Sequence, residues 1–106
     1  IAPRTVFFKI GSDKLSPQEE MNLSYLANKI KESPNTTYTI NGYADSATGT
    51  PAFNQKLSLE RAQVVKDLLV KKYGISADRL KVAAGGGVDK FGQPILNRVV
   101  LVESAQ

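Results

Sequence analysis

The sequence predicts a two-layer α/β domain in which two helices pack on one face of a four-stranded sheet. Segments rich in β-branched and aromatic residues alternate with two segments whose apolar residues repeat every three to four positions. The resulting order is strand, helix, strand, helix, strand, strand, which is typical of this architecture. The length of 106 residues suits one hydrophobic core. We therefore assign residues 1–106 to a single domain.

The first strand and the first helix are predicted from residue types and a capping signal. Residues 5–10 are β-branched or aromatic except for one lysine, as in a strand. Residues 16–19 read Ser-Pro-Gln-Glu, a capping box with proline at the first helical position. The proline within residues 33–35 ends this helix. Its apolar positions form one stripe: Leu23, Leu26, Ala27 and Ile30.

The middle of the chain predicts a second strand, a loop and a second helix. Residues 37–43 alternate as a half-buried strand does, and residues 44–50 are polar and contain a glycine, as in a loop. The second helix is expected to begin at Pro51 or at Ser58 and to end at the glycine of residues 73–74. Its expected core positions are Leu57, Val64, Val65 and Leu68.

The last third of the chain predicts two strands with a glycine-rich connection. Residues 80–84 form a short strand that runs into three glycines at 85–87, and residues 97–102 form the last strand. Two glycines in this region have the spacing of a phosphate-binding loop. However, Gln93 and Pro94 stand where such a loop requires Lys and Ser or Thr. We therefore expect a flexible hairpin connection here rather than a nucleotide site.

The composition excludes several classes of site. The chain has no Cys and no His, so it lacks a thiol nucleophile, an imidazole base and the usual zinc and haem ligands. We expect no cofactor, no metal and no enzymatic activity. The net charge of +4 favours anionic partners weakly, but the lysines are scattered and an aromatic–glycine motif is absent, so we expect no nucleic acid. No apolar run reaches the ~18 residues of a membrane-spanning helix, and any leader or anchor is expected outside this chain.

One segment combines an acidic residue, a loop and an arginine. Asp45 directly follows the second predicted strand, and Arg61 lies in the early turns of the helix that follows the loop. In open α/β sheets, ligands bind at the carboxyl ends of strands. If the helix begins near Pro51, Asn54, Ser58 and Arg61 share one face. The spacing leaves two interpretations open: a ligand site, or a structural salt bridge between Asp45 and Arg61.

These residues belong to a longer pattern that covers nearly the whole chain and consists of Phe8, Leu15-Ser16-Pro17, Gly42-Tyr43-Ala44-Asp45, Gly49, Asn54, Leu57-Ser58, Arg61-Ala62, Val65, Leu69, Gly74-Ile75, Arg79-Leu80, Gly87 and Asn97-Arg98. This pattern resembles that of a known family, the OmpA-like peptidoglycan-binding domains. Three features depart from it. The loop after Asp45 is one residue longer than in many members, and Ala44 replaces the usual Thr or His. The common ending Asn-Arg-Arg-Val is Asn97-Arg98-Val99-Val100 here.

The resemblance implies both a topology and a set of ligand residues. It implies a mixed sheet in the order 1-4-2-3, with the last strand antiparallel and inserted between the first and the second. It implies that Asp45 and Arg61 hold the ligand. The other implied site residues are Asn54 and Leu57, which shape the pocket, and Ala44, Ser46 and Phe8, whose surroundings supply backbone donors. We assign no role to Arg98 on this basis.

The resemblance also implies the function. It implies non-catalytic binding of cell-wall peptidoglycan through the diaminopimelate of the stem peptide, tethering an outer-membrane protein to the wall. The domain would then lie in the periplasm of a Gram-negative bacterium, and its parent protein, whether porin, lipoprotein or stator protein, would be anchored in a membrane outside this chain. The alternative is a protein–protein interaction module on the same fold that does not bind the wall.

Overall fold

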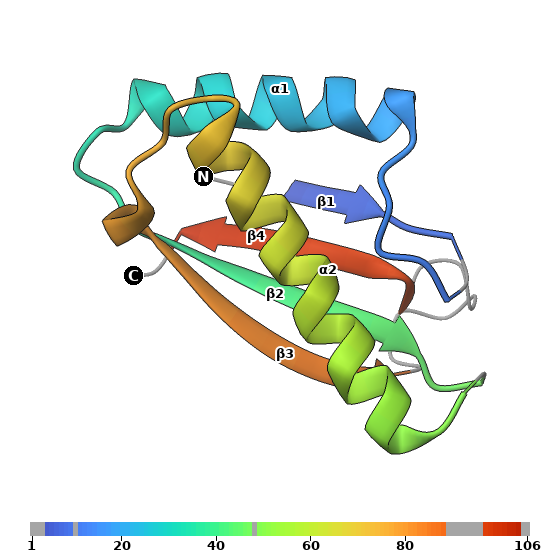
Figure 1. Ribbon diagram of the computed structural model, residues 1–106. Helices are drawn as coiled ribbons and strands as arrows, with labels where there is room; N and C mark the ends of the chain where they lie inside the picture. The colour runs from blue at the N-terminus through green and yellow to red at the C-terminus, as the bar shows by residue number, and fades with distance from the viewer. Residues whose placement is uncertain (1–3, 10, 48, 89–96, 105–106) are drawn as a thin grey trace.

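The computed structural model describes residues 4–9, 11–47, 49–88 and 97–104, which form a sheet with both helices on one face (Figure 1). The elements are β1 (Arg4–Phe7), α1 (Pro17–Glu32), β2 (Tyr38–Asp45), α2 (Pro51–Lys71), a 3-10 turn (Ala77–Arg79), β3 (Leu80–Val88) and β4 (Val99–Ser104). Neither helix in these ranges is long and apolar enough to cross a membrane. The predicted order of elements and the two-layer architecture are confirmed.

The sheet has the strand order β1-β4-β2-β3, as the resemblance implied. β4 is antiparallel to both neighbours, whereas β2 and β3 are parallel and are connected through α2. An interior strand loses solvent on both edges and, in this sheet, also on the helix side. Accordingly, Val100 and Val102 of β4 are fully buried. This topology places the carboxyl end of β2 between β4 and β3.

Local capping sets the two helix starts. The Ser16 hydroxyl accepts a hydrogen bond from the Glu19 N–H at 3.2 Å, and the Thr50 hydroxyl accepts one from the Phe53 N–H at 3.1 Å. Of the two predicted starts of α2, Pro51 is therefore correct. The predicted core face of α2 was partly wrong: Leu57 and Val65 are buried, but Val64 and Leu68, which flank the buried stripe of the helix, are only half-buried. The α2 residues that join the main hydrophobic core are Ala62, Val65 and Leu69.

The glycines at 85–87 lie within β3, so the expected flexible connection at these residues was wrong. They permit close packing. A Cβ on Gly85 would come within 2.2 Å of the Tyr43 ring. Gly86 has φ +70° and donates its N–H to the Ser58 hydroxyl at 3.0 Å. β2 also extends further than predicted, so Asp45 is its last residue rather than part of a loop. Gln93 and Pro94 lie outside the described residues.

Arg79 stabilises the end of the molecule opposite Asp45. Its guanidinium donates to the carbonyls of Ile30 at 2.8 Å, Ser33 at 2.6 Å and Thr36 at 3.1 Å, and it lies over the Tyr38 ring at the start of β2. These carbonyls are at the carboxyl end of α1 and in the turn after it, where helical partners run out. Arg79 thus closes α1 onto the sheet.

We expect Arg79→Gln to lower the free energy of unfolding by about 2 kcal/mol, because several charge-assisted hydrogen bonds are lost. Urea unfolding measures the change. Lys29→Gln, an exposed charge removal on α1, is the control and should change stability by less than about 0.5 kcal/mol. Equal effects of the two substitutions would contradict the capping role.

Candidate functional site

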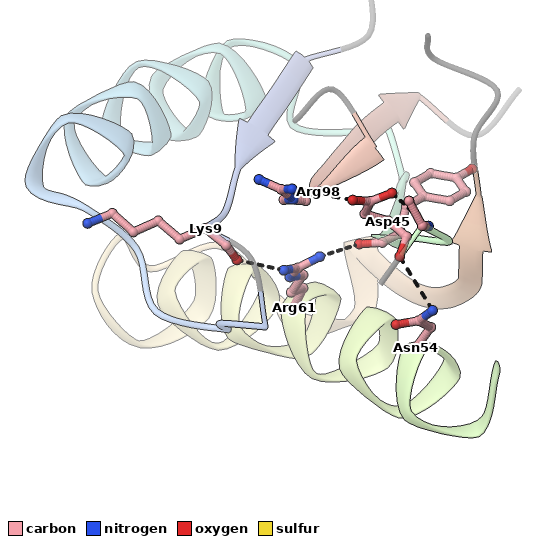
Figure 2. Close-up of polar contacts among 7 residues, drawn as sticks. Lys9, Asp45, Asn54, Arg61 and Arg98 are labelled. Carbon is pink, nitrogen blue, oxygen red and sulfur yellow. Dashed lines mark hydrogen bonds and ion pairs between the residues drawn. The ribbon is translucent and has the colours of Figure 1, made fainter. Parts of the chain in front are cut away.

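Asp45 is the last residue of β2, at the carboxyl edge of the sheet (Figure 2). Only 3% of its side chain is exposed. Its Oδ1 accepts a hydrogen bond from the Ala47 N–H at 3.0 Å, and its Oδ2 pairs with Nη2 of Arg98 at 3.3 Å. The amide of Asn54, in the first turn of α2, donates to the Asp45 carbonyl at 3.4 Å. Backbone and side-chain contacts thus hold this carboxylate in place.

Arg61 projects from α2 into the interior and is fully buried. Its Nε donates to the Ser12 carbonyl at 2.8 Å, and its Nη1 and Nη2 donate at 2.9 Å to the carbonyls of Tyr43 and Lys9 (Figure 2). The guanidinium also lies 5.3 Å from the centroid of the Phe8 ring. One side chain therefore connects the β1–α1 loop to the end of β2.

The sequence left a structural salt bridge between Asp45 and Arg61 open, and that interpretation was wrong. The carboxylate of Asp45 pairs with Arg98, and Arg61 binds carbonyls. Spacing along one helix brought Arg61 near the correct edge of the sheet. It did not reveal that β4, from a distant part of the chain, delivers a second arginine to the same carboxylate.

Arg61 is a buried cation without a carboxylate partner in the described part of the chain, where no acidic group lies within 4.0 Å of it. Burial, together with the nearby positive charge of Arg98, lowers the pKa of Arg61 to about 10, although Asp13 and Asp45 act to raise it. The group is still protonated at neutral pH. Desolvating a charge is unfavourable unless dipoles or counter-charges compensate it. This position is therefore one where an added anion would be stabilised.

The remaining predicted site residues differ in accessibility. Asn54, Leu57 and Ala44 are buried, at 4%, 5% and 1% exposure, whereas Ser46 is exposed. Ser46 and Asn54 line a hollow of about 270 Å³ together with Gly85–Gly87. Asn54 and Arg61 project from α2 near the carboxyl end of β2, where Asp45 lies, and Leu57 is a buried residue of α2 between them in sequence.

Phe8 contacts both arginines. Its N–H donates to the Arg98 carbonyl at 2.8 Å, and its buried ring has its centroid 5.3 Å from the Arg61 guanidinium. The expectation that the surroundings of Phe8 supply backbone donors to a ligand stays a prediction. A second hollow of about 520 Å³ lies beside Phe8, lined by Lys9, Ser12 and Glu19 among others.

Comparison with known proteins identifies the family of this chain. A family model described as "OmpA family" matches residues 7–94. The chain belongs to the OmpA family. Among OmpA-family relatives, Outer membrane protein 40 of Porphyromonas gingivalis is 36% identical over 107 residues, covering 100% of this chain and 28% of that protein. The peptidoglycan-binding protein ArfA of Mycobacterium tuberculosis is 37% identical over 81 residues, covering 74% of this chain and 24% of that protein. This OmpA-family chain thus spans about a quarter of the length of these relatives.

The OmpA-family fold is also found among solved structures. The peptidoglycan-associated lipoprotein of Burkholderia pseudomallei superposes with a TM-score of 0.82 at 24% identity, covering 96% of this chain and 90% of that one. At this identity the likeness shows the fold alone. It includes the strand order that places β4 next to β2.

Proposed function

We propose that this OmpA-family domain binds peptidoglycan non-covalently, and that it recognises the free end of diaminopimelate in the stem peptide. The observation that carries the proposal is the pairing of a held carboxylate, Asp45, with a buried cation, Arg61, that lacks a carboxylate partner among the described residues. The relationship to a protein named for peptidoglycan binding supports it.

The chemistry of the ligand matches the two charges. The free end of diaminopimelate carries an ammonium and a carboxylate on one carbon. Asp45 accepts from the ammonium, and Arg61 attracts the carboxylate. A guanidinium carries five N–H groups, and the carbonyl contacts of Arg61 use one on each nitrogen. One N–H on each of Nη1 and Nη2 is not used by these carbonyls. Because Arg61 is fully buried, a ligand carboxylate would reach these N–H groups only after neighbouring groups move, and such charge-assisted bonds are stronger than neutral ones.

The same residues favour binding over catalysis. Ser58 of α2 carries a hydroxyl, a group that can act as a nucleophile. This hydroxyl donates to the Gln55 carbonyl at 2.8 Å and accepts a hydrogen bond from the Gly86 N–H. The chain has no His to activate it. An oppositely charged pair holds a zwitterion, whereas acid–base catalysis needs groups whose pKa values are driven apart. We infer a module that retains the wall without cleaving it.

The wider role follows from the relatives. Several are outer-membrane proteins, so we propose that this domain lies in the periplasm and tethers a larger outer-membrane protein to the wall. The alternative, a protein–protein interaction module on the same fold, would need neither charge. The presence of both Asp45 and Arg61 at the expected positions favours the peptidoglycan-binding function over the interaction module.

A co-sedimentation experiment with purified cell-wall sacculi tests the proposal. We expect the domain to sediment with the sacculi and Asp45→Asn to remain largely in solution, because the amide cannot pair with an ammonium. The isosteric change should leave the fold intact, which a thermal melt verifies. Asp67→Asn removes the same charge from the exposed surface of α2 and should bind like the original chain. Equal sedimentation of both variants would exclude Asp45 from the site, and no sedimentation of the unchanged domain would favour the interaction module.

A further inference from the structure

Arg98 lies between Asp45 and the surface. It directly precedes β4, and its backbone is held by the hydrogen bond between its carbonyl and the Phe8 N–H. Its side chain is 20% exposed, whereas that of Asp45 is 3% exposed. Within the ion pair, Arg98 is therefore the partner that solvent reaches. A ligand that approaches Asp45 from the side of the ion pair meets Arg98.

The ion pair between Arg98 and Asp45 is not a tight one. Its N–O distance is 3.3 Å, whereas charge-assisted N–H···O bonds are commonly about 2.7–2.9 Å. Nε of Arg98 is buried and has no hydrogen-bond acceptor among the described residues. A buried donor without an acceptor carries a desolvation cost that a new acceptor would relieve. The guanidinium thus has an unused N–H beside the one that contacts Asp45.

Arg98 also differs from Arg61 in its freedom to change partners. Each nitrogen of Arg61 donates to a backbone carbonyl, and these carbonyls belong to three positions in the scaffold. Moving Arg61 would break all of them. Among the described residues, the side chain of Arg98 contacts one partner, the carboxylate of Asp45. Its side chain is therefore the exchangeable cation of the site.

From these observations we infer that Arg98 selects zwitterionic ligand ends through an exchange of ion-pair partners. The ligand ammonium replaces Arg98 at the carboxylate of Asp45, and the released guanidinium of Arg98 binds the ligand carboxylate. The inference rests on the proposed function and specifies how that site discriminates. In the exchange one loose ion pair is replaced by two, and the N–H of Nε gains an acceptor. No covalent bond changes.

The exchange has a different outcome for a simple ammonium, such as the end of a lysine side chain. That ligand also displaces Arg98 from Asp45, but it brings no carboxylate for the released guanidinium. A partly buried cation is then left without a partner, which is unfavourable. Arg98 therefore acts against monocationic ligands as well as in favour of zwitterions, and both effects contribute to specificity.

Calorimetric titration with two stem peptides tests the inference. One peptide carries diaminopimelate and the other carries lysine at the same position. We expect Arg98→Gln to weaken the diaminopimelate peptide by roughly 10- to 100-fold, because a charge-assisted contact is lost. The lysine peptide should bind up to about fivefold more tightly, because it no longer breaks a partly exposed ion pair. Arg98→Lys retains the charge without the planar fork and should give an intermediate preference.

The controls separate selection from a structural role. Lys56→Gln removes one exposed positive charge from α2 and should change either affinity by less than about twofold. Thermal melts establish that each variant is folded. If Arg98→Gln weakens both peptides by the same factor, or keeps the original preference, the inference is overturned while the proposed function stands. If the unchanged chain binds neither peptide, the proposed function fails and this inference fails with it.

Discussion

Replacing Arg61 with alanine is expected to lower the affinity for a diaminopimelate stem peptide by roughly 30-fold to several thousand-fold. Removing one partner of a partly desolvated charge pair costs about 2–5 kcal/mol of binding free energy, which corresponds to this range of affinities. The variant should also show a clearly smaller preference for the diaminopimelate peptide over the lysine peptide, because the fixed cation that favours the extra carboxylate is gone and only Arg98 is left to select it. Calorimetric titration of both peptides measures the two effects together.

Arg61→Ala is also expected to be less stable, by roughly 3 kcal/mol, since three backbone carbonyls lose a buried charged donor. Stability alone therefore does not separate a ligand role from a structural one. Arg79→Ala is the matched control, because Arg79 likewise donates to three backbone carbonyls but at the other end of β2. It should lose stability and keep its peptide affinity and preference.

Arg61→Lys covers the case in which the alanine variant does not fold. Lysine keeps the positive charge but offers a compact ammonium in place of a planar fork. We expect it to fold and to show a reduced preference for diaminopimelate. If a folded Arg61 variant keeps the original preference, Arg61 serves the scaffold alone and Arg98 is left as the cation that contacts the ligand.

Gly42→Ala is expected to lower the free energy of unfolding by about 3 kcal/mol or more, at the upper end of the cost of overpacking a core. A Cβ on Gly42 would lie 1.9 Å from the Ser58 carbonyl oxygen and 2.9 Å from its carbon. Both are backbone atoms of α2, so no side-chain rotation relieves the clash. The helix would have to separate from β2, whose end holds Asp45. Urea unfolding monitored by far-UV circular dichroism gives the size of the loss.

Gly85→Ala is the comparison for Gly42→Ala. Its Cβ would also be too close to a neighbour, at 2.2 Å, but that neighbour is the ring of Tyr43, a half-buried side chain. A side chain has rotamers to escape into, whereas the backbone of a helix does not. We expect a clearly smaller loss for Gly85→Ala. A loss as large as that of Gly42→Ala would mean that Tyr43 is as fixed as the helix backbone.

The element order was predictable because it depends on local signals. The Ser16 and Thr50 caps, the helical stripe around Leu23 and Ile30, and the β-branched strands each act within a few residues. The errors occurred where tertiary contacts decide. Gly85–Gly87 read as a connection because glycine is a poor strand former on average, but packing against Tyr43, Ser58 and Asn54 makes it necessary in this part of β3.

The sequence by itself determined the two helices, the four strands, the absence of thiol and imidazole chemistry, and Asp45 and Arg61 as candidate site residues. The tertiary structure alone decided their partners. It buried Arg61 among the carbonyls of Lys9, Ser12 and Tyr43, and it brought Arg98 to Asp45 across 53 positions of sequence. The physical reason is that periodicity and capping act locally, whereas the partner of a charge depends on which strands become neighbours. Here that neighbour is β4, the last strand of the described chain, which pairs with β2 although the two are far apart in sequence.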